Sequence, residues 1–488
     1  MFKTSLIVSL LLIASVLLRV LYIDRYDLTD NETLTLCRLN GYAVVNSPEL
    51  QLQETIPDTL THSAIQQKKT WENVANATIH DSGNAIGYQL ALYYWSKLFG
   101  DTNMALRMFS AIFGILTVIL GYYFCRQLFN KRTATIAGVL LCLHPVLIEY
   151  SQMARTYALA TFFILLTTYS IYQIAVAKKH VWLHIPLYVI SLNISLWCHY
   201  VTLYVFISHI FLVAIFHSHK KALIQYAIMA IFSFGIFSIW LVNGGYEGKK
   251  IISIERSMWQ HNVAVNGEEP EMVTSASDTI YQMVMNFVRI FGNDLDTESR
   301  NYGFYLLLLL PFAIVFFVFL KVRKSEFFRP VMFVTFPMVL YIIMIVIMVI
   351  RTRHSIPFDI RYATFIMPFA CMLLAFGFDR MIAYNSKLTV PAYALIIVVI
   401  LVMLAGLSPG LLRNPNMEIR KRSFVYQDAS SFLNTNIVPG DTLFFRSKED
   451  MIMTDFYMRT KLDPVLVTDF KQEEMIVIKG VGKRVKYK

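Results

Sequence analysis

Two carboxylates close together provide the first candidate chemistry in this chain. Asp30 and Glu32 lie in the run Thr29-Asp30-Asn31-Glu32-Thr33, shortly after the first apolar stretch. A hydroxyl that attacks an anomeric carbon must lose its proton as the new bond forms, and a positioned carboxylate can take that proton as a general base. The competing interpretation is that both residues are solvated loop residues or helix caps.

A second polar cluster, His80-Asp81-Ser82-Gly83-Asn84, ends the same loop. His80, Asp81 and Asn84 beside a glycine could line a pocket for a head group. A capped helix start would explain these residues about equally well.

Arg155 lies in a third polar segment, Glu149 to Tyr157, between two apolar runs. The positive-inside rule disfavours a lone arginine on the outer side of a membrane, so Arg155 needs an anionic partner there. A phosphate suits it, because a guanidinium offers a planar, bidentate fork. The alternative is a structural pair with Glu149.

Further cationic and aromatic residues follow in two other connections between apolar runs. His199 and Tyr200 lie in one of them, and Arg361 and Tyr362 lie in the other, near Arg351, Arg353 and His354. Such a set could neutralise the charge that develops on a departing lipid phosphate. Each histidine taken alone is better explained as an interfacial side chain.

The composition indicates an integral membrane protein. The 488 residues are 56% hydrophobic and 16% charged, with a mean hydropathy of +0.51, outside the usual range for soluble proteins. The net charge of +11 does not indicate nucleic-acid binding, because Lys and Arg cluster in short segments between apolar runs. The five cysteines show no CxxC spacing, so neither a disulfide framework nor a metal site is predicted.

The apolar runs predict a bundle of about eleven transmembrane helices, because about 20 residues cross the hydrocarbon layer. The first run follows Lys3 without a cleavage site and is expected to remain as a span. The expected spans are Leu6–Leu18, Met104–Phe124, Thr133–Leu147, Tyr157–Val176, Val181–Leu196, Val201–Phe216, Ala222–Val242, Tyr302–Leu320, Pro330–Ile350, Ala363–Phe378 and Thr389–Leu407.

Loop charges then give the topology. With the N-terminus inside, every inside loop is basic, and three large segments lie outside: 22–103, 243–301 and 408–488. The amphiphilic stretch Ile86–Phe99 is expected along the membrane interface. The tail becomes polar, with short alternating runs such as Thr442–Phe445, which predict a small α/β domain. We therefore divide the chain into a membrane domain, 1–407, and an extracytoplasmic domain, 408–488.

Several motifs of the membrane region resemble the GT-C glycosyltransferases of the protein mannosyltransferase and lipid A aminoarabinose transferase type. The most specific is Tyr150-Ser151-Gln152 followed by Ala154-Arg155 and Tyr157-Ala158-Leu159. The remaining motifs are Leu98-Phe99-Gly100-Asp101, Ala105-Leu106-Arg107, Ser110-Ala111, Phe113-Gly114, Arg126-Gln127-Leu128-Phe129, His199-Tyr200 and Arg361-Tyr362 followed by Pro368. The resemblance covers most of the membrane region but not the tail.

The resemblance implies an inverting transferase with a polyprenyl-phosphate sugar donor, a catalytic acidic residue in the first outer loop and no required metal. It also favours a bacterial inner membrane, with a glycolipid, polysaccharide or protein as acceptor. This chain departs from the family pattern in three places. Asn31 separates Asp30 from Glu32, so either carboxylate can be the base. Met153 replaces a frequent glutamate, and the usual histidine or lysine with proline is absent near Asn84.

Two other function classes compete with a transferase. A transporter or flippase of lipid-linked sugars predicts charged residues at mid-membrane depth, whereas the centres of these apolar runs contain almost no Asp or Glu. The third hypothesis is a non-catalytic scaffold that displays the tail. For the transferase we expect Glu32→Gln or Asp30→Asn to abolish transfer while the fold stays intact.

Overall fold

The computed structural model describes most of the chain, in two compact units. The described residues are 2–21, 23–44, 55–81, 85–216, 220–251, 253–254, 326–352, 360–384, 386–412, 425–438, 440–458, 463–469, 476–480 and 483–487. The first unit comprises Met1–Leu21, Met108–Ile239 and Glu269–Asn414. The second comprises Tyr22–Arg107, Trp240–Glu268 and Pro415–Lys488.

The first unit is helical and contains the apolar runs. Its helices are α1 (Phe2–Val20), α6 (Asn103–Leu128, whose first residues belong to the second unit), α7 (Lys131–Leu143), α8 (Pro145–Ser151), α9 (Tyr157–Tyr172), α10 (Val181–Cys198), α11 (Leu203–Phe216), α12 (Lys220–Trp240), α16 (Phe328–Thr352), α17 (Ile360–Ala363), α18 (Met367–Tyr384) and α19 (Thr389–Leu412). Helices are expected here, because hydrocarbon leaves no water to satisfy backbone N–H and C=O groups.

The polytopic helical fold predicted from the sequence is confirmed. Among the described residues, seven helices are long and apolar enough to cross a membrane, or eight if the bent pair α7 and α8 forms one span. Two further apolar helices, Leu6–Val20 and Tyr200–Phe216, are shorter. Each predicted span in the described part of the chain coincides with a helix, whereas the expected span Tyr302–Leu320 lies outside it.

The bend between α7 and α8 has a cause in the sequence. Pro145 is the first residue of α8, and the preceding His144 has an extended backbone conformation. Proline has no N–H to donate and disfavours helical geometry in the residue before it, so the helix must break at this point. The two helices meet at 55°.

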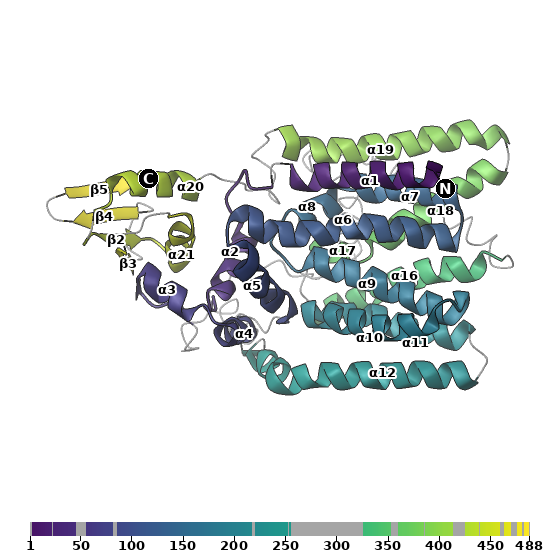
Figure 1. Ribbon diagram of the computed structural model, residues 1–488, viewed down its shortest axis with the longest axis horizontal. Coiled ribbons are helices and arrows are strands. Elements are labelled where there is room, and N and C mark those ends of the chain that lie inside the picture. The colour runs from purple at the N-terminus through teal and green to yellow at the C-terminus, as the bar shows by residue number, and fades with distance from the viewer. Residues whose placement is uncertain are drawn as a thin grey trace. The chain divides into compact units, whose positions relative to one another are not determined.

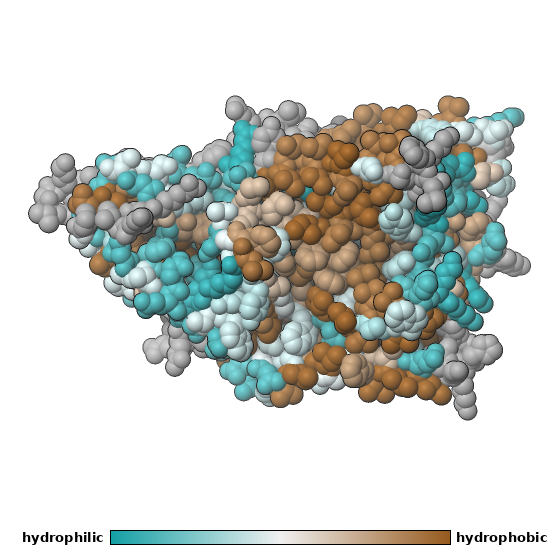
Figure 2. Space-filling model, viewed as in Figure 1, coloured by the Kyte–Doolittle hydropathy of each residue, from teal (hydrophilic) through white to brown (hydrophobic). Residues whose placement is uncertain are grey.

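Within the first unit the long helices run side by side (Figure 1). Helix α9 packs along α10, α7 against α18, and α11 against α16. Figure 2 shows a broad hydrophobic surface over the long helices. Leu10 and Leu17 of α1 and Val390 and Leu401 of α19 are among the exposed apolar side chains of this unit. An apolar surface of this extent is what lipid tails would cover.

The second unit joins the first large loop, 22–103, to the tail. The loop supplies α2 (Asp30–Leu39), α3 (His62–Lys68), α4 (Trp71–His80) and α5 (Gly87–Phe99), and the tail supplies α20 (Val425–Asn436) and α21 (Lys448–Tyr457). Helix α5 covers the predicted amphiphilic stretch. Its predicted place at the membrane interface stays a prediction.

One five-stranded sheet contains a strand from the loop and four strands from the tail. Its strands are β1 (Thr59–Leu60), β2 (Thr442–Phe445), β3 (Val465–Thr468), β4 (Ile476–Gly480) and β5 (Lys483–Tyr487), in the order β1-β3-β2-β4-β5. Strands β2 and β3 are parallel and are connected through α21, whereas the other pairs are antiparallel. The predicted alternating run Thr442–Phe445 is confirmed as a strand. The edge strand β1, which comes from the loop, was not predicted.

Candidate active site

Glu32 helps to start α2. Thr29 precedes the helix, and Glu32 accepts hydrogen bonds from the Thr29 backbone N–H at 3.0 Å and from its hydroxyl at 3.1 Å. This is one half of a capping box, in which a threonine and a glutamate three residues later satisfy the first backbone groups of a helix. Glu32 therefore caps the start of α2, as one of the two interpretations of the sequence expected.

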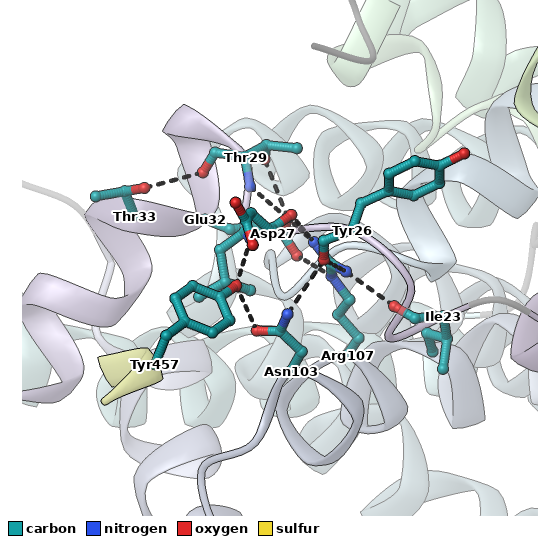
Figure 3. A network of polar contacts seen from close by, with 10 residues as sticks. Ile23, Tyr26, Asp27, Thr29, Glu32, Thr33, Asn103, Arg107 and Tyr457 are labelled. Atoms are coloured by element: carbon teal, nitrogen blue, oxygen red, sulfur yellow. Dashed lines mark hydrogen bonds and ion pairs between the residues drawn. The ribbon is translucent and has the colours of Figure 1, made fainter. Parts of the chain in front are cut away.

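Arg107 of α6 binds the same carboxylate through two parallel contacts. The Nε atom lies 2.8 Å from Oε1 of Glu32, and a terminal nitrogen lies 2.7 Å from Oε2. Both side chains are buried, with 4% of Arg107 and none of Glu32 exposed. Figure 3 shows the guanidinium between Glu32 and the preceding loop, where it donates to the carbonyls of Ile23, Tyr26 and Asp27 at 2.8–3.0 Å. One side chain thus holds the whole turn before α2.

Residues of the tail complete this network. The Tyr457 hydroxyl donates to Oδ1 of Asn103 at 2.9 Å and accepts from the backbone N–H of Leu28 at 2.8 Å. Burial and the nearby charge of Asp27 raise the pKa of Tyr457. Asp27 is itself buried and accepts a hydrogen bond of 2.8 Å from the backbone N–H of Tyr426. Sequence reasoning missed Asp27 and Tyr457.

The network affects the two predicted catalytic carboxylates differently. Both oxygens of Glu32 accept charge-assisted hydrogen bonds from Arg107, so this carboxylate is committed to a buried ion pair. Asp30 is the first residue of α2, and the placement of its side chain lies outside what the structure describes. A signal for Arg107 was present in the sequence, since Ala105-Leu106-Arg107 puts an arginine near the start of an apolar run.

The second predicted cluster holds two helices together. His80 ends α4 and is partly exposed, and Asp81 follows as the cap residue. Asp81 is buried and forms an ion pair with Arg38 of α2. Asn84 lies outside the described residues. Asp81 therefore fixes α4 against α2, and its predicted role in substrate binding stays a prediction.

In the first unit, five predicted substrate-binding residues come together from three separate connections. The Tyr157 and His199 rings lie 6.1 Å apart, and the His199 and Tyr362 rings lie 5.4 Å apart, edge to face. The Arg155 guanidinium lies 5.9 Å from the Tyr157 ring, and that of Arg361 lies 5.7 Å from the Tyr362 ring. We call these five residues the cationic cluster. Tyr200 follows His199 in a short 3-10 turn, Tyr200–Thr202.

Hydrogen bonds to the backbone hold the connections that form the cationic cluster. The Ser110 hydroxyl donates to the carbonyl of Arg155 at 3.1 Å, and the Tyr341 hydroxyl donates to the carbonyl of Tyr362 at 2.9 Å. The Thr156 hydroxyl donates to the carbonyl of Cys198, next to His199, at 3.0 Å. The functional side chains are therefore carried by segments whose backbones are tied to neighbouring helices.

The electrostatics of the cationic cluster favour an anion. Burial, followed by the charges of Arg155 and Arg361, lowers the pKa of His199 to about 3. The imidazole is therefore neutral at physiological pH, and it can donate one hydrogen bond and accept another. The charges of two guanidinium groups at one imidazole indicate a positive potential in the cluster. The planar shape of guanidinium groups suits phosphate oxygens.

Across the described ranges, no three or more His, Cys, Asp or Glu side chains are grouped in a way that could bind a metal ion.

Comparison with known proteins gives a match to a family model over part of the chain, and a similar fold. The model of the dolichyl-phosphate-mannose-protein mannosyltransferase family matches residues 85–242. A comparison with curated proteins gives no match. The solved structure of ArnT from Cupriavidus metallidurans in the apo state is similar with a TM-score of 0.55 and 12% identity, over 95% of this chain and 86% of that one.

A second similar structure is an oligosaccharyltransferase from Archaeoglobus fulgidus, solved in complex with Zn and sulfate. The TM-score is 0.52 and the identity is 13%, over 88% of this chain. This chain spans 55% of the length of the oligosaccharyltransferase. The shared fold and the family match support a membrane glycosyltransferase of the GT-C type, which confirms the resemblance seen in the motifs.

Proposed function

We propose that this membrane glycosyltransferase of the GT-C type moves a sugar from a polyprenyl-phosphate carrier to an acceptor outside the cytoplasm, with inversion at the anomeric carbon. The observation that carries the proposal is the convergence of Arg155, His199 and Arg361 in one cluster. The name of the matching family supports the donor class, because dolichyl-phosphate mannose is a polyprenyl-phosphate sugar.

The cationic cluster would bind the phosphate of the donor. In the transfer step the acceptor hydroxyl forms a bond to the anomeric carbon, and the bond from that carbon to the phosphate oxygen breaks. The bonding electrons leave with the lipid phosphate, whose charge grows in the transition state. Fixed guanidinium groups stabilise that charge without reorganisation. Tyr157 and Tyr362 hold the guanidinium groups over their rings.

The acceptor hydroxyl loses its proton to a carboxylate of the first loop. Of the two predicted residues, we assign this role to Asp30, because both oxygens of Glu32 are engaged by Arg107 and Thr29. Glu32 then acts as a positioning residue that fixes the start of α2, where Asp30 is the first residue. His80, Asp81 and Asn84 follow in the same loop and remain candidates for the sugar side of the site.

The proposed location rests on the distribution of basic residues among the loops. The first loop and the tail lie outside if the basic loops lie in the cytoplasm, and the resemblance favours a bacterial inner membrane. A carrier lipid would reach the cationic cluster from the bilayer, and a glycolipid, polysaccharide or protein would supply the hydroxyl.

The test is release of free polyprenyl phosphate by the purified protein from a panel of polyprenyl-phosphate sugars, with candidate acceptors present. We expect release by the wild type and none by Asp30→Asn, whose folding is checked by its melting temperature. The conservative variant Asn31→Asp is the matched control and should retain release. Donor binding without release by the wild type, for every donor and acceptor, would favour a transporter or flippase instead.

A further inference from the structure

The second unit contains an open pocket with a cavity volume of about 1250 Å³. It is lined by residues of α3, α20 and α21 and by the connection from α5 to α6. Of the network around Glu32, it shares Asn103 and Tyr457. Pockets for single small ligands measure about 300–1,000 Å³, so this one has room for several linked units.

One face of α20 supplies uncharged polar groups to the pocket. Gln427, Ser430, Ser431 and Asn434 line it, and they follow one another at the spacing that brings residues to one side of a helix. Gln427 is half-buried, and Ser431 and Asn434 are exposed. Amides and hydroxyls both donate and accept hydrogen bonds. Such a face matches a ligand that carries many hydroxyl groups, each of which is also donor and acceptor.

Two rigid aromatic rings line another part of the pocket. Phe456 and Tyr457 are half-buried and pack edge to face with ring centroids 5.0 Å apart. The Tyr457 hydroxyl is already engaged by Asn103 and Leu28, so the ring is held in place. A fixed ring offers contact area at little entropic cost, and the C–H face of a pyranose is flat and apolar enough to pack on it.

The charges of the pocket disfavour anionic ligands. Three carboxylates line it, those of Asp24, Asp101 and Asp455, against the single imidazole of His62. Asp455 pairs with His62, and Asp101 pairs with Lys69, which lies outside the lining. The lining includes no arginine or lysine among the described residues. A phosphate or a uronate would therefore meet net repulsion.

We propose that this pocket binds neutral sugar units of a glycan acceptor. The proposal rests on the proposed transferase function and names the class of its acceptor: an oligosaccharide or glycolipid whose sugar units carry no charge. The amide and hydroxyl face of α20 hydrogen-bonds the sugar hydroxyls, and Phe456 and Tyr457 pack against the ring faces.

The test measures glycan binding without any donor. Fluorescently labelled, full-length protein in detergent is applied to an array of neutral, amino-sugar and acidic oligosaccharides, and titrations give the affinity for the neutral glycan bound best. The double variant Gln427→Ala with Asn434→Ala removes two hydrogen-bonding groups. We expect at least tenfold weaker binding, since each bond contributes about a factor of three to ten. Phe456→Ala should weaken binding independently.

The matched control is Asn436→Ala, on the same helix and also exposed but outside the pocket lining. It should bind like the wild type. Absence of binding to every neutral glycan, equal binding by the double variant, or stronger binding to acidic glycans would overturn the proposal. Preferential binding of a peptide library through the same residues would overturn it in favour of a protein acceptor.

If the proposed transferase function is wrong, the release assay and the glycan-binding assay give a different combination of results. In that case no donor releases polyprenyl phosphate, while glycan binding still depends on Gln427 and Asn434. If the transferase function holds and the pocket proposal fails, release proceeds and the double variant leaves the KM for a neutral acceptor unchanged.

Discussion

Arg107 binds Glu32 through two parallel contacts of 2.8 and 2.7 Å inside the second unit, and no part of the Glu32 side chain is exposed. Arg107 also donates to backbone carbonyls of the preceding loop. The pair therefore couples the first large loop to the start of α6. Its removal affects the fold as well as any chemistry near Asp30.

The first prediction concerns this pair. The sequence alone led us to expect that Glu32→Gln leaves the fold intact. The structure instead predicts that it lowers the free energy of unfolding by roughly 3–5 kcal/mol, because it leaves the buried Arg107 charge without its anion. Arg107→Gln should cost about as much, and the double variant should cost less than the sum of both. Thermal unfolding of the purified proteins measures this. Wild-type melting temperatures for both single variants would contradict the structural role of Glu32. Glu32 would then again be a candidate for the general base.

The second prediction concerns the cationic cluster. Arg155→Gln and Arg361→Gln should each raise the KM for the lipid-phosphate donor about 10- to 100-fold, because a charged hydrogen bond to phosphate contributes about 1.5–3 kcal/mol. Arg126→Gln is the matched control, since Arg126 is an exposed arginine near the end of α6. Donor titrations with all three variants provide the measurement. An unchanged KM for both cluster variants would exclude the cluster as the phosphate site.

The third prediction is a pH dependence. The hydrogen bond to Asp455 raises the pKa of His62 above 6.5. The protonated pair therefore stabilises the second unit fully below about pH 6.5, and this stabilisation is lost as pH rises through the raised pKa. The melting temperature of the wild type should fall over that range relative to His62→Gln. Parallel melting curves for the two proteins from pH 5.5 to 8.5 would contradict the assignment.

The fourth prediction tests the contact between two sequence motifs. A Cβ atom added to Gly114 in α6 would lie 2.6 Å from the Cβ atom of Ser151 in α8, closer than real side chains approach. Gly114→Ala should destabilise the protein by about 1–3 kcal/mol through overpacking.

The matched control for that contact is Gly235→Ala in α12, where an added Cβ meets nothing within 4 Å. This variant should melt at or slightly above the wild-type temperature, since alanine favours helix over glycine. Equal melting temperatures for the two glycine variants would mean that Gly114 of α6 does not lie against Ser151 of α8.

The helices of the first unit could be predicted because the solvent constrains them. In hydrocarbon an apolar run of sufficient length has few alternatives to a helix, so run length alone identified α9, α10 and α16. Strand β1 could not be found this way. It has two residues, and its partner in β3 follows about four hundred positions later, beyond the reach of any local pattern.

The site was predictable in its parts but not in its assembly. Residue type and membrane topology singled out Arg155, His199 and Arg361, yet only helix packing brings the three connections together. Helix capping was one of the interpretations of Asp30 and Glu32 in the sequence, whereas the pairing of Glu32 with Arg107 depends on a helix that begins about seventy residues later. Contacts of that kind are set by the tertiary fold and leave no trace in local spacing.

The pairing of Thr59 with Val467 and of Leu60 with Leu466 has a topological consequence. Two strands of one sheet must lie on the same side of a bilayer, so the chain between β1 and β3 crosses the membrane an even number of times. Ten of the predicted runs fall in that interval. The two-residue strand β1 therefore requires an even number of crossings. Adding or deleting a single crossing in the interval would put β1 and β3 on opposite sides of the membrane, where they could not pair.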